Sequence, residues 1–388
     1  MRTFVMCLLI AGAIVVIHPA NAAGSPRARD LGIPFDGTAG PLNAITDVAG
    51  VTVGQVSIVE DLPDHRAVRT GVTTVLPRGD ATREKPVFGA WFALNGNGEM
   101  TGTTWIEESG FLEGPVMITN THSVGAVHQA TIEWRVAEGN ADASGYWWSL
   151  PVVAETWDGH LNDINGFHVK AEHAHAAIRS ASGGPVAEGN VGGGTGMICH
   201  EFKCGIGTSS RVAETRDGAY TVGVLVQANY GLRDTLRIAG VPVGQHLTED
   251  RAYASLAPPI AENGSIIVVV ATDAPLLPHQ LKRIAKRASF GVARVGGMAG
   301  NGSGDIFVAF STANDEANQA GAVVSVRMLA NDHVSPLFDA TVLATEEAIV
   351  NAMVAARDMT GDRGHTVKAI DHDELRKVLR KYKRLGKQ

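Results

Sequence analysis

The feature that most constrains the fold of this chain is a set of short segments in which nearly every residue is apolar. They are rich in Val and Ile and are bounded by Gly, Pro or Asn, which is typical of β-strands. A strand without alternating polar residues must be covered on both faces. The strands expected on this basis are residues 44–53, 72–76, 90–94, 116–119, 220–228, 266–271 and 306–310.

Segments with a helical period lie between these strands. In one of them, Leu281 and Ile284 fall on one face while Lys282 and Arg283 fall on the other, which is typical of a helix packed on a core. Strands and helices interleave without a long linker, which favours one layered α/β domain. The expected helices are residues 124–137, 169–180, 278–289 and 337–359.

The overall charge and the lack of cofactor motifs exclude several classes of function. The formal net charge is −7, and no basic block occurs before residues 377–387, so a nucleic-acid-binding surface is not expected. The glycine run 192–196 lacks the Lys and Ser or Thr that follow a phosphate-binding loop. His173 and His175 are two residues apart and would face different sides of a helix, which makes a poor metal pair. We therefore predict neither a cofactor nor a metal.

Residues 1–22 are predicted to be a secretory signal peptide. Arg2 precedes an apolar run that is short for a transmembrane helix, and the small-residue trio Ala20, Asn21 and Ala22 follows it. Cleavage after Ala22 would deliver a periplasmic or secreted protein, and a retained N-terminal anchor is the alternative. The mature chain would keep Cys199 and Cys204, for which a disulfide and two unpaired thiols both remain open.

Two glycine-rich loops and one Gly-Ser pair are the candidate functional features. The loops at 189–207 and 296–304 allow sharp turns and close backbone approach, and two such loops in one domain suggest a constructed site rather than simple turns. Gly264 and Ser265 stand at the foot of a buried strand. There the Ser265 hydroxyl could attack the preceding carbonyl in an N-to-O acyl shift. The alternative is that Asn-Gly-Ser forms an ordinary turn before the strand.

After such a cleavage, Ser265 would combine a nucleophile and a base in one residue. A free α-amine titrates near pH 8, whereas a serine hydroxyl is inert until a base takes its proton. The freed amine would be that base. Ser265 would then be an N-terminal nucleophile.

Five stretches, in this order, extend the argument to nearly the whole mature chain. They are RARDLGIPFDGTAGPLNAITDVAGVTVG, NVGGGTGMICHEFKCGIGTSSR, VLVQANYG, NGSIIVVVATDAPL and AGNGSGDIFVAFSTAN. On these motifs the sequence resembles the DmpA and BapA family of L-aminopeptidase/D-esterases and β-aminopeptidases. The resemblance implies a four-layer α/β/β/α sandwich. It also implies that a precursor splits between Gly264 and Ser265 into an α chain, residues 23–264, and a β chain, residues 265–388.

The resemblance also assigns roles to individual residues. Ser265 would attack the substrate, and Ser303 and Asp305 in GNGSGD would orient the hydroxyl and its amine. Asn229 in VLVQANYG would stabilise the oxyanion. Without the resemblance, Ser303, Asp305 and Asn229 would be interpreted as turn residues at strand ends.

In PVVAETWDGHLND, the resemblance makes Glu155 the anchor for the substrate ammonium group. Trp157 departs from the tyrosine expected in the D-esterase branch; its indole can donate a hydrogen bond but cannot act as an acid or base. CHEFKCG departs from the expected pattern at Glu201 and Cys204, where glycine is expected. A disulfide across this short loop would affect stability more than catalysis.

The function expected from the resemblance is removal of an N-terminal β-amino acid, D-alanine or small L-residue through an acyl-enzyme on Ser265. The resemblance further implies associated α and β chains and a homotetramer of αβ pairs. An acyltransferase of the ornithine acetyltransferase type is the enzymatic alternative. An unprocessed periplasmic binding protein is the non-enzymatic alternative.

Overall fold

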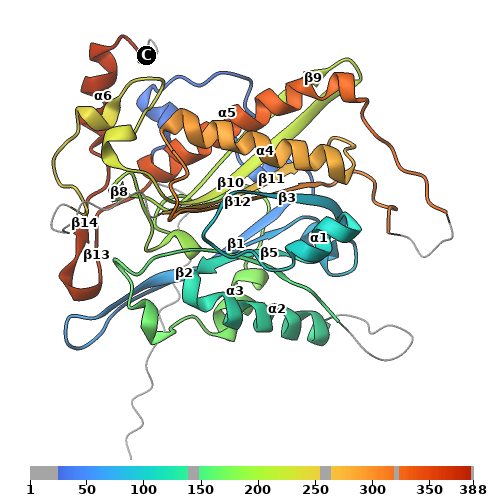
Figure 1. The fold of residues 1–388 in the computed structure, drawn as a ribbon, viewed down its shortest axis with the longest axis horizontal. Helices are drawn as coiled ribbons and strands as arrows, with labels where there is room; N and C mark the ends of the chain where they lie inside the picture. Colours follow the sequence, from blue (N-terminus) through green and yellow to red (C-terminus); the bar gives the residue numbers. More distant parts are fainter. Residues whose placement is uncertain (1–24, 139–147, 254–263, 319–322, 386–388) are drawn as a thin grey trace, which may run out of the picture.

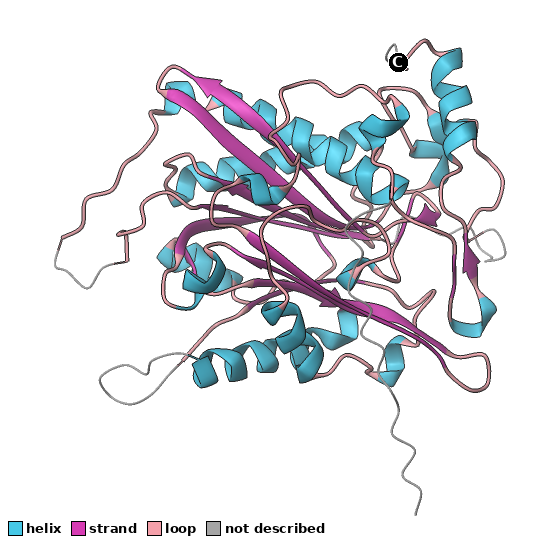
Figure 2. Cartoon of the chain, turned by 180° about the vertical axis from the view of Figure 1, so that it is seen from behind, coloured by secondary structure: helices cyan, strands magenta, loops and turns pink. Residues whose placement is uncertain are grey.

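The computed structural model describes residues 25–138, 148–253, 264–318 and 323–385, and its strands form two stacked sheets (Figure 1). The first sheet has the strand order β1-β2-β5-β6, and the second has the order β4-β3-β12-β11-β10-β9. Helices α2 and α3 cover the outer face of the first sheet, and α4 and α5 cover that of the second (Figure 2). This arrangement is the expected four-layer α/β/β/α sandwich.

The strands of the two sheets follow the chain as β1 (Thr52–Asp61), β2 (Ala67–Leu76), β3 (Val87–Gly96), β4 (Phe111–Leu112), β5 (Val116–Asn120), β6 (Val152–Thr156), β9 (Ile206–Thr215), β10 (Gly218–Asn229), β11 (Ser265–Thr272) and β12 (Gly304–Ser311). The helices are α1 (Thr103–Ser109), α2 (Val124–Glu138), α3 (Ala171–Arg179), α4 (Pro278–Val295), α5 (Ser335–Val354) and α6 (His372–Lys381). Two small hairpins pair β7 (Ile198–Cys199) with β8 (Phe202–Lys203), and β13 (Met359–Thr360) with β14 (Thr366–Val367).

The core forms layers that explain why some strands are apolar throughout. In β11, Ile267 and Val269 point into the cluster between the sheets, while Ile266 and Val268 point into the cluster beneath α4 and α5. A third cluster packs α2 and α3 against the first sheet. Every residue of β11 is therefore buried, as the sequence pattern predicts. No helix among the described residues is long and apolar enough to cross a membrane.

A crossover through α4 brings together the starts of β11 and β12, which are parallel neighbours. The helix begins with Pro278 at its first position, where the missing N–H costs no hydrogen bond. It ends at Gly296, whose φ of 105° is a left-handed conformation that favours glycine. The register places Ser265 directly beside Gly304, so the Gly264–Ser265 pair and the 296–304 loop converge on one end of the second sheet.

The strand expected at residues 44–53 is wrong over most of its length. The structure has a 3-10 turn at Ile45–Asp47, and β1 begins only at Thr52. The Asp47 carboxylate accepts hydrogen bonds from the backbone N–H groups of Leu42 and Ala44 and from a serine hydroxyl of β9. The apolar side chains are thus buried by a turn that a distant strand holds in place.

The helix expected at 337–359 ends earlier than predicted. Helix α5 stops at Val354, and Met359 belongs to the β13–β14 hairpin. The side-chain amide of Asn190 accepts from the N–H of Arg357 and donates to its carbonyl, so the backbone there is paired with another segment. The other expected strands and helices coincide with elements of the structure.

Candidate active site

A cavity of about 640 Å³ lies where strands of both sheets end. Strand β10 ends and β11 begins at this edge of the second sheet, and β5 and β6 of the first sheet end there as well. The cavity brings together Ser265, Gly264, Asn229, Glu155 and Trp157, all predicted from the sequence. Its walls also include Thr121, His160, Ile198, Tyr230, Leu232 and Tyr253.

Ser265 and Asn229 are direct partners in the antiparallel pairing of β10 with β11. Side chains of directly opposed residues project from the same face of a sheet, with Cβ atoms about 5 Å apart. Both residues are almost fully buried in the sandwich, and both line the cavity. The hydroxyl and the amide are therefore held by rigid strands on one side of the same space.

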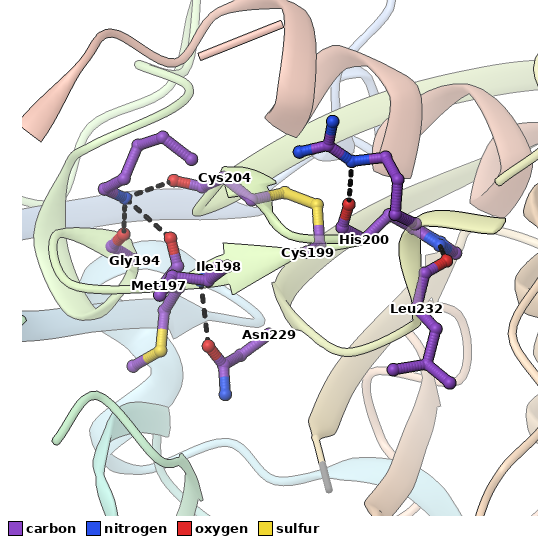
Figure 3. The surroundings of a disulfide bond; sticks show 10 residues. Gly194, Met197, Ile198, Cys199, His200, Cys204, Asn229 and Leu232 are labelled. Atoms are coloured by element: carbon purple, nitrogen blue, oxygen red, sulfur yellow. Dashed lines mark hydrogen bonds between the residues drawn. A yellow bond between two sulfur atoms is a disulfide. The ribbon is translucent and has the colours of Figure 1, made fainter. Parts of the chain in front are cut away.

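The amide of Asn229 has a defined orientation. Its Oδ1 accepts a hydrogen bond of 2.8 Å from the backbone N–H of Ile198, as the dashed line in Figure 3 shows. A backbone N–H can only donate, so the atom facing Ile198 must be the oxygen, and the Nδ2 group must point the other way. The amide thus presents its N–H donors to the cavity, which is the orientation that an oxyanion requires.

The peptide bond before Ser265 lies in a crowded and polarised environment. The Gly264 carbonyl accepts a hydrogen bond of 3.0 Å from the N–H of Gly304. A methyl group at position 264 would come within 2.5 Å of both the Asn229 carbonyl oxygen and the Tyr230 Cα. Only glycine fits this position without moving the backbone.

Ser303 and Asp305 lie beside Ser265 at the start of β12, but they do not line the cavity. The Ser303 hydroxyl donates to Asp305 Oδ1 over 2.8 Å, and both side chains are buried. Two asparagines hold this loop: the Asn95 side-chain amide donates to the Ser303 carbonyl, and that of Asn97 donates to the Gly302 carbonyl. Asn95 and Asn97 were not identified in the sequence, because their partners are some two hundred residues away.

Glu155 is a buried carboxylate at the end of β6. Its Oε1 accepts from the backbone N–H of Glu99 at 3.0 Å, and its Oε2 accepts from the Thr121 hydroxyl. Burial raises the pKa of Glu155, and these two hydrogen bonds oppose that shift only in part. A cation entering the cavity would stabilise the ionised form, so the site favours a positively charged group.

An aromatic wall encloses the cavity beside Glu155. Trp157 lines it with 43% of its surface exposed. His160 packs edge-on against Tyr253 with ring centroids 5.1 Å apart, and it stacks on His365. Burial and the neighbouring His365 lower the pKa of His160 to about 4, which keeps this imidazole neutral at physiological pH. His160, Tyr253 and Thr121 were missed because only the folded chain brings them to Glu155.

The cysteines, the glycine run and the histidine pair noted in the sequence all lie outside the cavity lining. Cys199 and Cys204 form a disulfide with a Cα–Cα distance of 5.4 Å, which closes the β7–β8 hairpin. The glycines at 192–194 form a 3-10 turn at which a Cβ on Gly193 would contact Gln227 and the Ile118 carbonyl. His173 and His175 lie on α3, away from the cavity lining. Within the described ranges, no group of three or more His, Cys, Asp or Glu is placed to hold a metal ion.

Comparison with known proteins places this geometry in a family context. The profile of peptidase family S58 matches residues 43–367. The chain is 54% identical to the β-peptidyl aminopeptidase BapA of Sphingosinicella microcystinivorans, over 97% of each chain. The structure resembles the L-aminopeptidase D-Ala-esterase/amidase of Ochrobactrum anthropi, a serine aminopeptidase described as a variant of the Ntn hydrolase fold. The TM-score is 0.87 at 50% identity over 93% of this chain and 100% of that one. A β-aminopeptidase of a Burkholderia species superposes with a TM-score of 0.84 at 49% identity, over 94% and 100% of the two chains.

Proposed function

The chain belongs to peptidase family S58 and is a serine aminopeptidase, and from this premise we propose that it releases β-amino acid residues from the N-termini of peptides and amides. The names of its relatives support this substrate class, since two of them are β-aminopeptidases. D-Alanine and small L-residues are the further substrates that fit the family. Ser265 carries the reaction after the chain has cleaved itself.

Self-cleavage proceeds at the bond between Gly264 and Ser265. The Ser265 Oγ attacks the Gly264 carbonyl carbon, the C–N bond breaks, and an ester joins the two residues. Water then hydrolyses the ester and leaves a carboxylate on Gly264 and a free α-amine on Ser265. The hydrogen bond from the Gly304 N–H to the Gly264 carbonyl supports this step, because it draws electron density away from the attacked carbon.

The processed enzyme then uses the same serine on a substrate. The α-amine accepts the hydroxyl proton as Oγ attacks the substrate carbonyl, and the Asn229 Nδ2 group donates to the oxyanion. The amine returns the proton to the leaving amine, and water hydrolyses the acyl-enzyme. Ser303 immediately precedes β12 and Asp305 lies on it, next to the strand that begins with Ser265, where they would hold the new amine through the hydroxyl–carboxylate pair.

Glu155 binds the substrate's ammonium group. The carboxylate is buried at the cavity that contains Ser265, and it accepts hydrogen bonds from two neutral donors, the Glu99 N–H and the Thr121 hydroxyl. A substrate with a free N-terminal amine would supply the missing positive charge, whereas an N-acylated one would leave the carboxylate buried without it. Trp157 forms part of the wall and shapes the pocket.

The observation that carries the proposal is the pairing of Ser265 with Asn229 on adjacent strands at the cavity, next to a glycine whose place no larger residue could take without moving the backbone. The direct test is N-terminal sequencing of the smaller fragment, which should begin at Ser265. Ser265→Ala should remain one uncut chain of 388 residues less its leader. A wild-type chain that stays intact and yet hydrolyses peptides would refute the mechanism.

The substrate class needs a separate assay. Purified enzyme should hydrolyse a β-alanyl amide and should leave N-acetylornithine unchanged. Acetyl transfer from N-acetylornithine, without hydrolysis of the amide, would instead indicate the acyltransferase alternative. A single band on a denaturing gel with no activity on either compound would indicate an unprocessed binding protein.

Location and assembly complete the proposal. Residues 1–22, the proposed signal peptide, lie outside the described residues, and export to the periplasm or medium fits the disulfide, which persists in oxidising compartments. The α and β chains would stay associated, since β11 of the β chain is paired with β10 of the α chain within one sheet.

Exposed apolar residues such as Val323 and Met328 support the proposed tetramer of αβ pairs.

A further inference from the structure

Lys203 is a fully buried lysine at the end of β8. Its Nζ donates to the carbonyls of Met197 and Cys204, each at 2.7 Å, and the Gly194 carbonyl lies 3.5 Å away (Figure 3). Among the described residues no carboxylate forms an ion pair with it. Burial lowers the pKa of Lys203, and the attraction of the Asp158 carboxylate opposes that shift. Burial of an amino group without a paired carboxylate costs free energy of desolvation, so we expect its contacts to serve a function.

The contact with Met197 leads directly to the active site. The Met197 carbonyl and the Ile198 N–H belong to the same peptide group, and that N–H donates to Asn229 Oδ1 over 2.8 Å. The path therefore runs from Lys203 Nζ through the 197–198 peptide to the Asn229 carboxamide, whose Nδ2 faces the cavity. Two amide groups, each accepting at oxygen and donating at nitrogen, join the lysine to the oxyanion donor.

Such a chain of hydrogen bonds strengthens its own last member. A donor at an amide oxygen draws electron density from the amide nitrogen, which makes the N–H a better donor. The gain is about 10–30% for each bond in condensed phase. Because an oxyanion is a charged acceptor, it benefits from a stronger donor more than the neutral substrate carbonyl does. The effect therefore falls on the transition state.

We call the path from Lys203 through the 197–198 peptide group to Asn229 the relay. The β7–β8 hairpin, to which Lys203 belongs, is held from its other side as well. The Arg233 guanidinium donates to the carbonyls of His200 and Glu201 at 2.9 and 2.8 Å. The Cys199–Cys204 disulfide closes the same hairpin. The peptide group at 197–198 is thus fixed, and Asn229 keeps one orientation without needing to reorganise during the reaction.

We propose that Lys203 is a positioning residue of the hydrolase, which orients and polarises the Asn229 amide through the Met197–Ile198 peptide group. The proposal rests on the oxyanion role of Asn229 in the proposed function. On this proposal, Lys203 helps to stabilise the transition state although it contacts neither the substrate nor Ser265.

The kinetic test replaces Lys203 with methionine, which keeps the length of the side chain but cannot donate. Removal of one oxyanion donor costs about 10²–10³-fold in kcat, so the loss of its polarisation and positioning should cost about tenfold. KM should change by less than about twofold, because ground-state binding through Glu155 is untouched. Rates are expressed per mole of N-terminal serine, so that incomplete processing does not lower the apparent kcat.

Phe202→Leu is the matched control, since it disturbs packing of the same hairpin and leaves every relay contact in place. Its kcat should stay within about twofold of the wild type, even where its thermal stability falls as much as that of Lys203→Met. Equal losses of kcat in the two variants would overturn the proposal and make Lys203 a purely structural residue.

A double-mutant cycle with Asn229→Ala separates this inference from the proposed function. In the Asn229→Ala background, Lys203→Met should lower kcat by less than about twofold, because the group through which it acts is absent. A full tenfold loss there would overturn the relay while leaving Asn229 as the oxyanion donor. Wild-type kcat in Asn229→Ala alone would instead refute the oxyanion role in the proposed function.

A spectroscopic test does not depend on processing. In uncut Ser265→Ala protein labelled with ¹⁵N at asparagine side chains, the Asn229 NH₂ protons should move upfield on adding Lys203→Met and stay in place with Phe202→Leu. Should Lys203→Met fail to fold, Lys203→Gln, which is too short to reach both carbonyls, should shift the same signals upfield. Unchanged Asn229 signals in the lysine variant would overturn the proposal.

Discussion

Replacement of Glu155 by glutamine isolates the charge of the substrate anchor. The Glu155 side chain accepts one hydrogen bond from the Glu99 N–H and another from the Thr121 hydroxyl. In the Glu155→Gln variant the amide oxygen can still accept from Glu99, and the amide nitrogen can donate to Thr121 once that hydroxyl rotates. Shape and hydrogen bonding are therefore conserved, and only the charge is lost.

The expected cost follows from the pairing of a buried carboxylate with the substrate ammonium. A hydrogen bond to a charged group contributes about 1.5–3 kcal/mol, which corresponds to a loss of roughly 10- to 150-fold in kcat/KM. Hydrolysis of a chromogenic β-alanyl anilide measures this ratio. Self-cleavage should remain complete on a denaturing gel, because no external ammonium takes part in it.

The pH dependence provides the internal check. Burial raises the pKa of Glu155, so the free enzyme must lose a proton from this carboxyl before it can bind an ammonium. Wild-type kcat/KM should therefore rise with pH through a carboxyl pKa above its ordinary value, and Glu155→Gln should lack that acid limb. The Ser265 amine titrates in both enzymes, so an unchanged kcat/KM, or a carboxyl titration that persists in the variant beside that of the amine, would refute the role of Glu155.

The other predictions concern processing and stability. Gly264→Ala should block self-cleavage, because its methyl group would come within 2.5 Å of the Asn229 carbonyl and Tyr230; a processed band on a denaturing gel would contradict this. Reduction of the Cys199–Cys204 disulfide, which spans 5 positions, should cost only about 2 kcal/mol of stability, measured by chemical denaturation with and without reductant. Glu347 forms ion pairs with the buried Arg211 and with Arg29, and Glu347→Gln removes the carboxylate from both. The variant should be less stable by about 3–5 kcal/mol, and an unchanged denaturation midpoint would contradict this prediction. Burial would raise the pKa of Glu347, but its two arginines lower it, so this contribution to stability should be present at neutral pH and lost on acidification below the ordinary glutamate pKa.

Part of the fold could be predicted because burial leaves a direct mark on sequence. A strand such as β11, apolar at every residue, must have cores on both faces, and that requirement already implies layers. The pattern fails where a tertiary contact replaces the sheet. Ala44, Ile45 and Val48 are buried like strand residues, yet Asp47, which bonds the Ala44 N–H and Ser210 of β9, holds them in a turn.

Part of the site was also accessible from the sequence. Ser265, Asn229, Glu155 and Trp157 were proposed from motifs, and the structure brings all four to one cavity. Ser303 and Asp305 are adjacent to Ser265 but outside the cavity lining, so their contact with the freed amine stays a prediction. The pairing of the two cysteines was left open by the sequence, and the structure forms the disulfide.

The sequence by itself determined the chemistry that the chain can offer: a serine behind a glycine at the foot of a buried strand, with an amide and a carboxylate on other segments. Only the tertiary structure decided how these groups face one another. Strand register sets Ser265 opposite Asn229, and Ile198 fixes which end of that amide meets the cavity. His160 and Tyr253 join the cavity wall through contacts between segments far apart in the chain, and Lys203, whose own contacts are local, reaches the site only through the hydrogen bond between Ile198 and Asn229. Such contacts leave no local pattern, because their energies arise only when burial brings the partners together and removes the water between them.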